Sequence, residues 1–286
     1  MERQRPAEVE VLTEILTHEE RKTLRKFRKA VPKGWDDHTL ARFLKARHFS
    51  FDKALEMFTK YLNWRRENDI DHVDSFEFPE APAYKEIYPH GFHKTDRLGR
   101  IIYIERYGFI DMKRMHQITT EERMVRYFIK EYESMLTYRI SSCCIAAGYR
   151  VEQSLTILDL GGSSAKLMKS SVYNFVKLAS NVCQDYYPEI LGKMFIVNTP
   201  MLFSIAWKVF RPWIDERTQK KIHIEGKNYQ KKLLELVAPE NLPDFLGGTC
   251  KCEGGCLNSD AGPWNDPEIR ARVEEERRRR EEEENR

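Results

Sequence analysis

Cys144 and Arg150 are separated by five residues, the spacing with which cysteine phosphatases hold a nucleophilic thiolate against a phosphate group. That chemistry requires a loop that follows a strand and begins a helix, because the loop amides and the helix N-terminus then bind the anion. The surrounding pattern predicts the opposite order, a helix before the segment and a strand after it, and Cys143 stands where the motif has histidine. We therefore reject a phosphatase site at this position.

Other signatures of catalysis and nucleotide binding are missing from the sequence. It contains no G-x-x-x-x-G-K-[ST] loop, no G-x-G-x-x-G after a predicted strand, no G-x-S-x-G elbow and no H-E-x-x-H pair. Residues 159–164 (DLGGSS) lie at a predicted strand-to-helix turn whose amides could bind an anion, but two adjacent glycines are better explained by a tight turn. The chain is therefore not expected to be an enzyme.

Three of the six cysteines, Cys250, Cys252 and Cys256, are close enough in sequence to offer thiolates to one metal ion. Their spacing is not that of a zinc finger, and no histidine follows them. We therefore expect no metal site and no cofactor. The N-terminus shows no secretory signal, so all six cysteines are expected to be reduced thiols.

Residues 202–214 (LFSIAWKVFRPWI) form a predicted helix that is too apolar for an ordinary surface helix. Its apolar arc spans about 200° of the helical wheel, roughly twice the width needed to cover a core. Such a helix either meets apolar material on two sides, a cavity and a membrane interface, or is buried on most sides in a large core. Periodicity alone leaves both interpretations open. The residues that make up the arc are Leu202, Phe203, Ile205, Ala206, Trp207, Val209, Phe210, Trp213 and Ile214.

The composition fits a protein of 286 residues with a sizeable core, since 41% of its residues are hydrophobic and 33% are charged. With a mean hydropathy of −0.64, no segment approaches the roughly 18 apolar residues of a membrane span. The net charge of +3 is too small to indicate nucleic acid. A basic run at residues 21–29 could favour anionic lipid, although such runs are usually solvated helix faces.

The predicted secondary structure that positions these residues differs between the first third of the chain, which is helical, and the rest, in which strands and helices alternate. The first third predicts helices at residues 9–30, 37–47 and 51–67, and a proline-containing linker follows at 78–82. Next comes a predicted hairpin, 91–95 and 100–106, and then alternating helices and strands, which indicates an α/β domain with a mostly parallel sheet. The alternating elements are helices 120–147, 164–181, 202–214 and 229–237 and strands 155–160, 194–198 and 221–224. The charged tail is expected to be a solvated helix or disordered, outside the fold.

Several segments together resemble the CRAL-TRIO family, and more narrowly its yeast-type secretory phosphatidylinositol/phosphatidylcholine transfer proteins. The resemblance covers nearly all of residues 35–265. It implies an N-terminal helical tripod (1–75), a lipid-binding domain (83–249) whose sheet floors a hydrophobic pocket under an apolar gate helix, a C-terminal wrapping segment (250–265) and a charged tail (266–286). The segments that carry it are 40–49 (LARFLKARHF), 88–99 (YPHGFHKTDRLG), 120–138 (TEERMVRYFIKEYESMLTY), 186–189 (YYPE), 229–233 (YQKKL), 240–243 (ENLP), 245–248 (FLGG) and 259–264 (SDAGPW).

The resemblance also implies a headgroup site for phosphatidylinositol. A cation pair suits a phosphodiester, and a carboxylate can orient a lysine or accept from inositol hydroxyls. Two basic positions of the family pattern are here His48 and Ile190, which implies weaker or pH-sensitive headgroup binding. The residues at the matching positions are Arg47, Glu189, Thr218 and Lys221.

A second implied site would take phosphatidylcholine at Tyr103, Ser154 and Thr156. Two hydroxyl residues two apart on a strand share one face, as an internal polar patch requires, although small and β-branched residues also simply fill strands. The position where the family pattern has a further aromatic hydroxyl is Phe92 here, which implies one hydrogen bond fewer to the choline phosphate. The family's gate corresponds to Phe203, Trp207, Phe210 and Trp213, with some aromatic rings facing the pocket and others facing outward.

The implied activity is exchange of phosphatidylinositol and phosphatidylcholine at membranes, in support of phosphoinositide synthesis and Golgi secretory traffic. Its ligand would be one bound phospholipid, and its partners membrane surfaces and a phosphatidylinositol kinase. We expect a monomer in the cytoplasm, transiently and peripherally on Golgi or endosomal membranes, without nucleic acid. The alternatives are a lipid-sensing adaptor with a different hydrophobic ligand and an α/β enzyme of unrecognised type. The resemblance makes the CxC…C segment structural.

Overall fold

The computed structural model describes residues 5–162, 170–201 and 203–284. Its N-terminal part is a small helical unit. Its core contains Phe27, Phe43 and Phe58, whose rings meet edge to face at centroid distances of 5.7 and 4.9 Å. The predicted single helix over 9–30 is wrong, because Thr17 and Glu20 form a capping box that begins a second helix inside it. The helices are α1 (Leu12–Ile15), α2 (His18–Ala30), α3 (Asp37–Ala46) and α4 (Phe51–Glu67).

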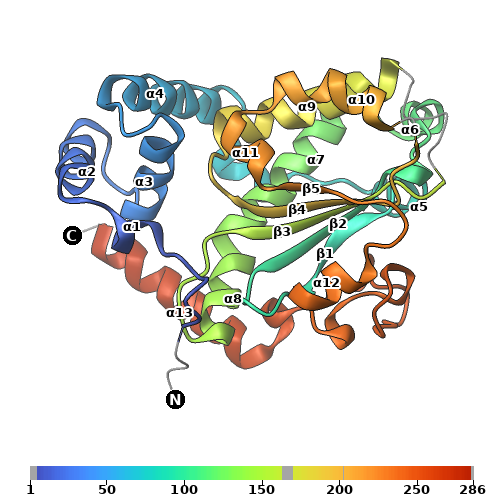
Figure 1. Ribbon diagram of the computed structural model, residues 1–286. Helices are drawn as coiled ribbons and strands as arrows, with labels where there is room; N and C mark the ends of the chain where they lie inside the picture. The colour runs from blue at the N-terminus through green and yellow to red at the C-terminus, as the bar shows by residue number, and fades with distance from the viewer. Residues whose placement is uncertain (1–4, 163–169, 202, 285–286) are drawn as a thin grey trace.

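The second part is built on a five-stranded sheet of order β1-β2-β3-β4-β5, shown at the centre of Figure 1. β1 and β2 are antiparallel, and the other neighbours are parallel, which confirms the predicted mostly parallel sheet. Asp96 closes the hairpin by accepting from the Leu98 and Arg100 amides, each at 2.9 Å. The strands are β1 (His90–Thr95), β2 (Ile101–Arg106), β3 (Ser154–Asp159), β4 (Leu191–Val197) and β5 (Ile222–Ile224).

Alternate residues of the strands separate the two faces of the sheet. Ile102, Ile104 and Ile157 pack against α12 (Gln230–Leu236) and the segment that follows it. The other face carries Tyr103 and Glu105 and is covered by five helices of the described chain, so it is the face on which a cavity can form. These helices are α5 (Ala81–Ile87), α6 (Met112–Ile118), α7 (Glu121–Ser134), α9 (Ser170–Tyr186) and α10 (Phe203–Phe210).

The predicted helix over 120–147 is one continuous helical rod with an irregular centre. Thr120 caps α7, a π-helical turn occupies Met135–Arg139, and α8 (Ile140–Ala147) ends at Gly148 in the left-handed region. The π turn presents the buried Arg139 to Asp260 at 3.2 Å, so it holds the C-terminal segment. Part of the predicted helix over 164–181 lies outside the described residues, and the described helix α9 runs on to Tyr186.

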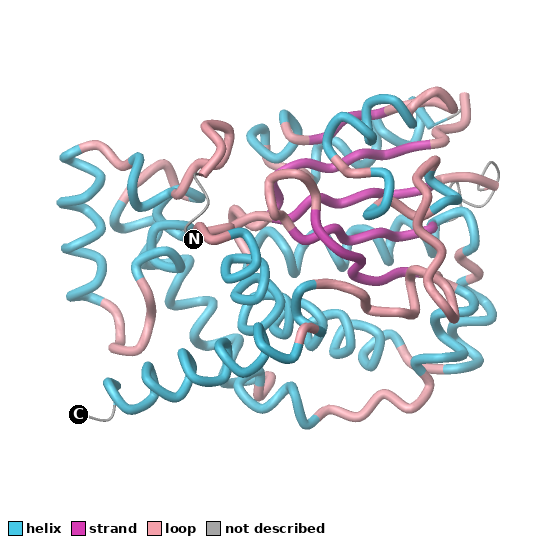
Figure 2. The backbone as a smooth tube through the Cα atoms, turned by 90° about the horizontal axis from the view of Figure 1, so that it is seen from below, coloured by secondary structure: helices cyan, strands magenta, loops and turns pink. Residues whose placement is uncertain are grey.

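Two further expectations differ from the structure. The linker expected at 78–82 is packed, since α5 begins at Ala81 and the Phe78 ring stacks on Tyr127 at 4.5 Å. The tail, expected as a solvated helix or a disordered segment outside the fold, is the mostly exposed helix α13 (Pro267–Glu284), but it contacts α8 and buries Val273. In Figure 2, α13 runs back from the strands toward the N-terminal helices. No described helix is long and apolar enough to cross a bilayer.

An apolar cavity with a charged mouth as candidate site

A cavity of about 760 Å³ lies between the sheet and helices α9 and α10. The strand register builds its floor: Tyr103 of β2 is the partner of Thr156 on β3, which is the partner of Met194 on β4, so the three side chains share one face. The wall is mainly apolar, and its size lies in the upper range of sites that enclose a small molecule. Apolar residues of its lining include Leu158, Leu160, Val176, Ala179, Met194 and Ile196.

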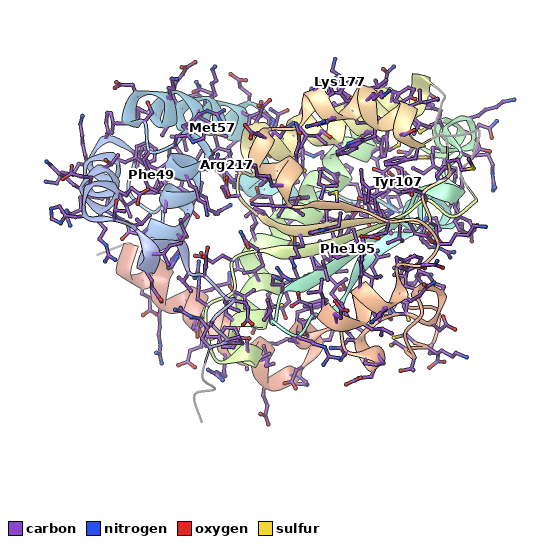
Figure 3. The ribbon with its side chains drawn as sticks, in the orientation of Figure 1. Phe49, Met57, Tyr107, Lys177, Phe195 and Arg217 are labelled. Atoms are coloured by element: carbon purple, nitrogen blue, oxygen red, sulfur yellow. The ribbon has the colours of Figure 1, made fainter. Side chains whose placement is uncertain are left out.

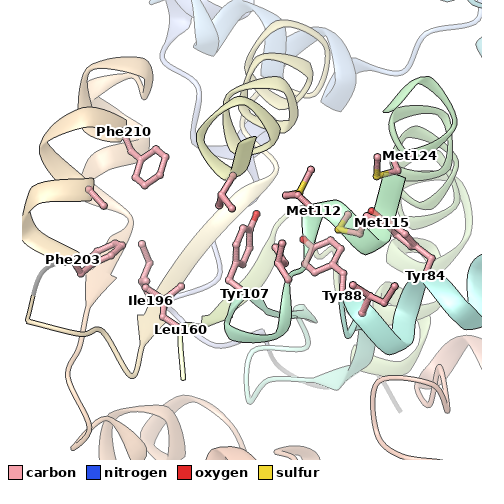
Figure 4. Close-up of a cluster of buried hydrophobic side chains, with 14 of the residues drawn as sticks. Tyr84, Tyr88, Tyr107, Met112, Met115, Met124, Leu160, Ile196, Phe203 and Phe210 are labelled. Atoms are coloured by element: carbon pink, nitrogen blue, oxygen red, sulfur yellow. The ribbon is translucent and has the colours of Figure 1, made fainter. Parts of the chain in front are cut away.

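Helix α10 closes one side of this cavity. Phe203 and Phe210 are buried and point inward, toward Leu160 and Ile196, as Figure 4 shows. Trp207 and Trp213 are half-buried and also line the cavity. All four predicted gate aromatics therefore line the cavity. Phe203 and Phe210 are its buried members, whereas Trp207 and Trp213 keep part of their surface exposed. Leu202, the first residue of the predicted gate, lies outside the described residues.

The outward face of α10 is also apolar, but aliphatic rather than aromatic. Ile205 is 50% exposed and Val209 is 43% exposed, and Met201, just before the helix, is 98% exposed. A helix buried on most sides in a core would not leave these side chains in water. Of the two interpretations that periodicity left open, the described structure therefore agrees with apolar surface on two sides of the helix.

The mouth of the cavity is charged and contains all four residues of the predicted inositol site. The Glu189 carboxylate binds Lys221 Nζ at 3.3 Å and Arg217 at 3.3 Å. Thr218 lies in α11 (Glu216–Lys220), whose first turn is capped by the Asp215 side chain. Figure 3 shows Arg217 where α11 meets the N-terminal helices, and its guanidinium also donates to the Lys45 carbonyl.

Arg47, at the end of α3, differs from the other cations of the mouth. Among the described residues, its guanidinium makes one hydrogen bond, to the adjacent Ala46 carbonyl at 3.1 Å. An arginine has five N–H donors, so most of those of Arg47 remain available to an anion. Carboxylates also line the mouth, so its charges are mixed, and Glu189 already pairs with two of its cations. The acidic lining residues are Asp185, Glu189, Asp215 and Glu216.

Sequence reasoning missed Arg217. Its signal was the basic residues that follow Glu216, with Arg217 one helical turn before Lys221 and so on the same side of α11. The pairing with Glu189 could not be foreseen, because Glu189 follows α9 and reaches the mouth only through the tertiary fold. The two departures from the family pattern, His48 and Ile190, both line the cavity; His48 is exposed and Ile190 is buried.

A smaller cavity of about 40 Å³ adjoins the large one around Glu105. Burial raises the pKa of the Glu105 carboxyl, and the hydroxyls of Tyr88, Tyr107 and Tyr103 act in the opposite direction. The residues shared by the linings of both cavities include Tyr103, Glu105 and Tyr107. Glu105 was also missed, although strand alternation from Ile101 through Tyr103 places this charged residue on a face that must be covered.

The predicted choline site is brought together only in part. Tyr103 and Thr156 line the large cavity, but Ser154 does not: it lies at the start of β3, buried, with its amide donating to the Ile190 carbonyl at 2.9 Å. Phe92 packs on the Tyr103 ring at 4.8 Å and lines neither cavity. The hydroxyl patch is therefore smaller than the resemblance implies, and the buried Glu105 lines the cavity together with Tyr103.

The rejected phosphatase spacing lies away from both cavities. Cys144 Sγ accepts from the Val151 amide at 3.1 Å and donates to the Val151 carbonyl at 3.3 Å, and burial raises the pKa of this thiol. Arg150 approaches Glu152 at 3.6 Å. The segment ends α8 and precedes β3, as the sequence predicts, so a neutral thiol occupies the place where that chemistry needs a thiolate.

The turn at Asp159–Gly162 is tight, which agrees with the preferred explanation of its glycines. The Gly161 amide donates to the Asp159 carboxylate at 2.9 Å, and Gly162 has φ of +80°. A Cβ on Gly108 would lie 1.6 Å from the Gly161 carbonyl oxygen, so the two backbones touch. The Gly161 amide is therefore already used inside the protein rather than presented to an anion.

Comparisons with known proteins agree with this architecture. A family model described as "CRAL/TRIO domain" matches residues 85–248, and one described as "CRAL/TRIO, N-terminal domain" matches residues 10–60. The Sec14 cytosolic factor of Schizosaccharomyces pombe is 45% identical over 234 residues, which cover 82% of each chain.

A plant protein, the phosphatidylinositol/phosphatidylcholine transfer protein SFH9 of Arabidopsis thaliana, is 39% identical over 273 residues. The alignment covers 92% of the present chain and 47% of the plant protein, so the chain spans about half the length of that relative. Among solved structures, the crystal structure of Sfh5 superposes with a TM-score of 0.67 at 19% identity, covering 91% of this chain and 97% of the other. At that identity the superposition shows the fold alone.

Proposed function

The chain belongs to the CRAL/TRIO domain family, and from that premise we propose that it binds one phospholipid in the large cavity and exchanges phosphatidylinositol and phosphatidylcholine at membranes. The observation that carries the proposal is the large cavity, which combines an apolar wall, a charged mouth and an apolar closing helix. The relatives named for phosphatidylinositol/phosphatidylcholine transfer support this lipid pair. No covalent bond is made or broken in such an exchange.

The apolar wall would shield the acyl chains from water. Each CH₂ group that leaves a bilayer for water loses about 0.8 kcal/mol, so a long acyl chain needs an equally long apolar surface along its path. The sheet floor, α9 and the inner face of α10 supply most of that surface. Charged side chains of the lining lie at the mouth and at Glu105, where a headgroup could lie.

The mouth would hold the inositol headgroup. Arg47 would bind the phosphodiester through its available donors, because a guanidinium matches two phosphate oxygens at once. Lys221 and Arg217 would complete the cationic side, and Glu189 would accept from inositol hydroxyls once the phosphate takes over part of its cations. Thr218 offers a hydroxyl on the same side.

The inner end of the cavity would hold the choline headgroup. A quaternary ammonium group is bound by aromatic faces and by a nearby carboxylate. Tyr103, Tyr107 and Glu105 border both cavities, and Thr156 lies beside Tyr103 in the strand register. We assign the two lipids to overlapping volumes with different headgroup positions, so that one replaces the other.

Exchange would take place with α10 at the membrane surface. The exposed apolar side chains Met201, Ile205 and Val209 would enter the interface, and movement of α10 would then uncover the cavity to lipid rather than to water. We place the protein peripherally and transiently on secretory-pathway membranes, acting as a monomer in support of phosphoinositide synthesis, with a phosphatidylinositol kinase as the consumer of its cargo.

Transfer between vesicles tests the proposal. Donor vesicles carry labelled phosphatidylinositol or labelled phosphatidylcholine, acceptors carry neither, and the chain is added in catalytic amount. Movement of both labels, with unlabelled lipid of either kind competing for both, is the expected result. Movement of neither lipid would refute the proposed function. A chain that binds phosphatidylinositol without releasing it to acceptors would act as a lipid-sensing adaptor instead.

A further inference from the structure

In the described structure a histidine lies beside the three cysteines of the C-terminal segment, although no histidine is near them in sequence. His93 of β1 lies among Cys250, Cys252 and Cys256, which follow η7 (Asp244–Leu246), and their ligating atoms all lie within 4.8 Å of one another. Three cysteines and one histidine are a common set for tetrahedral zinc. The missing histidine therefore comes from a strand far away in sequence rather than from the residues after the cysteines.

The sulfur atoms are spaced for a shared ion rather than for a disulfide. Cys250 Sγ and Cys252 Sγ are 3.7 Å apart, and all three cysteines are free thiols. A disulfide would bring two sulfurs to about 2.05 Å. Two thiolates on one tetrahedral zinc ion, each about 2.3 Å from it, are about 3.8 Å apart. The observed separation matches the second case.

The histidine supplies a second, independent observation. His93 is 0% exposed, and neither of its ring nitrogens has a hydrogen-bond partner of normal geometry among the described residues. A buried polar group without a partner is costly, and native structures rarely leave one. A metal ion bound to one ring nitrogen would satisfy an atom that the described part of the chain leaves unsatisfied.

The neighbouring charge also suits a metal–thiolate centre. Lys94, next to His93, donates from Nζ to Cys250 Sγ at 3.2 Å. Three thiolates and one Zn²⁺ ion carry a net charge of −1, which this ammonium group can balance. Lys94 Nζ is also held by the Glu240 carbonyl at 2.7 Å, so its position does not depend on the cysteine.

From these observations we propose that His93, Cys250, Cys252 and Cys256 bind one zinc ion that fastens the C-terminal segment to the outer strand of the sheet. Four protein ligands leave no open position, so the site is structural. The segment already lies along β1: the Lys94 amide donates to the Ala261 carbonyl at 2.6 Å, and a Cβ on Gly91 would lie 2.5 Å from the Leu257 carbonyl oxygen. Leu257 packs on the sheet face opposite the lipid cavity.

Metal analysis of the purified full chain tests this proposal. Zinc is counted by native mass spectrometry and by optical emission after purification without chelators or metal-affinity resin, and the expected content is about one zinc per chain. Replacement by Co²⁺ should give the visible d–d bands and thiolate charge-transfer absorption of a tetrahedral sulfur-rich site. A folded chain without bound zinc, whose reduced thiols give no tetrahedral Co²⁺ spectrum, would overturn the proposal. So would a disulfide between Cys250 and Cys252 in protein kept under reducing buffer.

Variants of the ligands locate the site. Cys252→Ser and His93→Ala should lose the stoichiometric zinc, whereas Cys144→Ser, which removes a thiol outside the cluster, should retain it. His93→Cys restores a fourth ligand and should bind zinc with a Co²⁺ spectrum shifted by the extra thiolate. Wild-type stoichiometry in both Cys252→Ser and His93→Ala would contradict the assignment. Should these two variants fail to fold, the wild-type metal content and Co²⁺ spectrum still decide the question.

Discussion

The outward face of α10 should supply much of the affinity for membranes. We would replace Ile205 and Val209 together by serine, which removes apolar surface that is about half exposed in the closed state. Complete burial of one such side chain contributes about 1.5 to 3 kcal/mol, so the exposed half contributes about 1 kcal/mol when it enters the interface. The double variant should therefore bind vesicles about 2 kcal/mol more weakly, roughly a 30-fold loss in partition coefficient.

The assay is sedimentation with vesicles of phosphatidylcholine and phosphatidylinositol, together with the rate of lipid transfer. A matched control replaces Ile15 and Ile224 by serine, since these residues are 49% and 39% exposed but do not belong to α10. Because all four positions are exposed, neither double variant should change the free energy of unfolding by much. Equal loss of vesicle binding in both variants, or no loss in the α10 variant, would refute a docking role for this face.

Three further results are expected. Replacing Arg47 and Lys221 by alanine should reduce phosphatidylinositol transfer by roughly 100-fold or more, since charge-assisted hydrogen bonds contribute about 1.5 to 3 kcal/mol each. Phosphatidylcholine transfer should continue. Unchanged phosphatidylinositol transfer would disprove the assignment of these residues to the inositol site. Glu105→Gln should weaken phosphatidylcholine binding selectively. The pKa of Glu105 is raised in the folded state, so its ionisation destabilises the fold once the pH exceeds the pKa of glutamate in the unfolded chain. At neutral pH the lipid-free Glu105→Gln variant should therefore unfold at a higher denaturant concentration than the wild type. A lower unfolding midpoint would contradict this. Arg123 lowers the pKa of Glu80 to about 2. Glu80→Gln should therefore be less stable than the wild type at neutral pH, and this difference in the free energy of unfolding should disappear as the pH falls from the pKa of glutamate in the unfolded chain toward 2. A difference in stability that persists at pH 2 would exclude this ion pair as its cause.

The sheet could be predicted from sequence because its signals are local. A hairpin turn at Asp96 and short β-branched strands separated by helical periodicity are sufficient for the order of elements. Helix ends were less predictable where a cap competes with periodicity. The apolar pattern runs through Leu16 and Thr17, but the capping box of Thr17 interrupts the helix there.

The residues of the candidate site also differ in how far the sequence could predict them. Arg47, Thr218 and Lys221 were predicted through the family motifs, not through any property of the residues themselves. Glu105 carried a detectable signal, a charge on a covered strand face. Arg217 needed knowledge of tertiary structure, because its pairing with Glu189 joins segments that no local pattern connects.

His93, in the cysteine cluster, could likewise not be predicted from local sequence patterns. A search for metal ligands by sequence spacing examines neighbours along the chain, whereas β1 and the C-terminal segment become neighbours only when that segment wraps over the edge of the sheet. Which of the gate aromatics face the cavity could not be assigned from sequence for a related reason. The helical wheel gives the width of the apolar arc but not which part of it faces the sheet.

Native mass spectrometry of the chain purified from cells, with identification of the released ligand, tests the central claim most directly. The account predicts a folded chain that carries one phospholipid molecule, phosphatidylinositol in part of the population and phosphatidylcholine in the rest. A chain that carries no lipid, or one whose cavity holds a hydrophobic molecule other than a phospholipid, would contradict it.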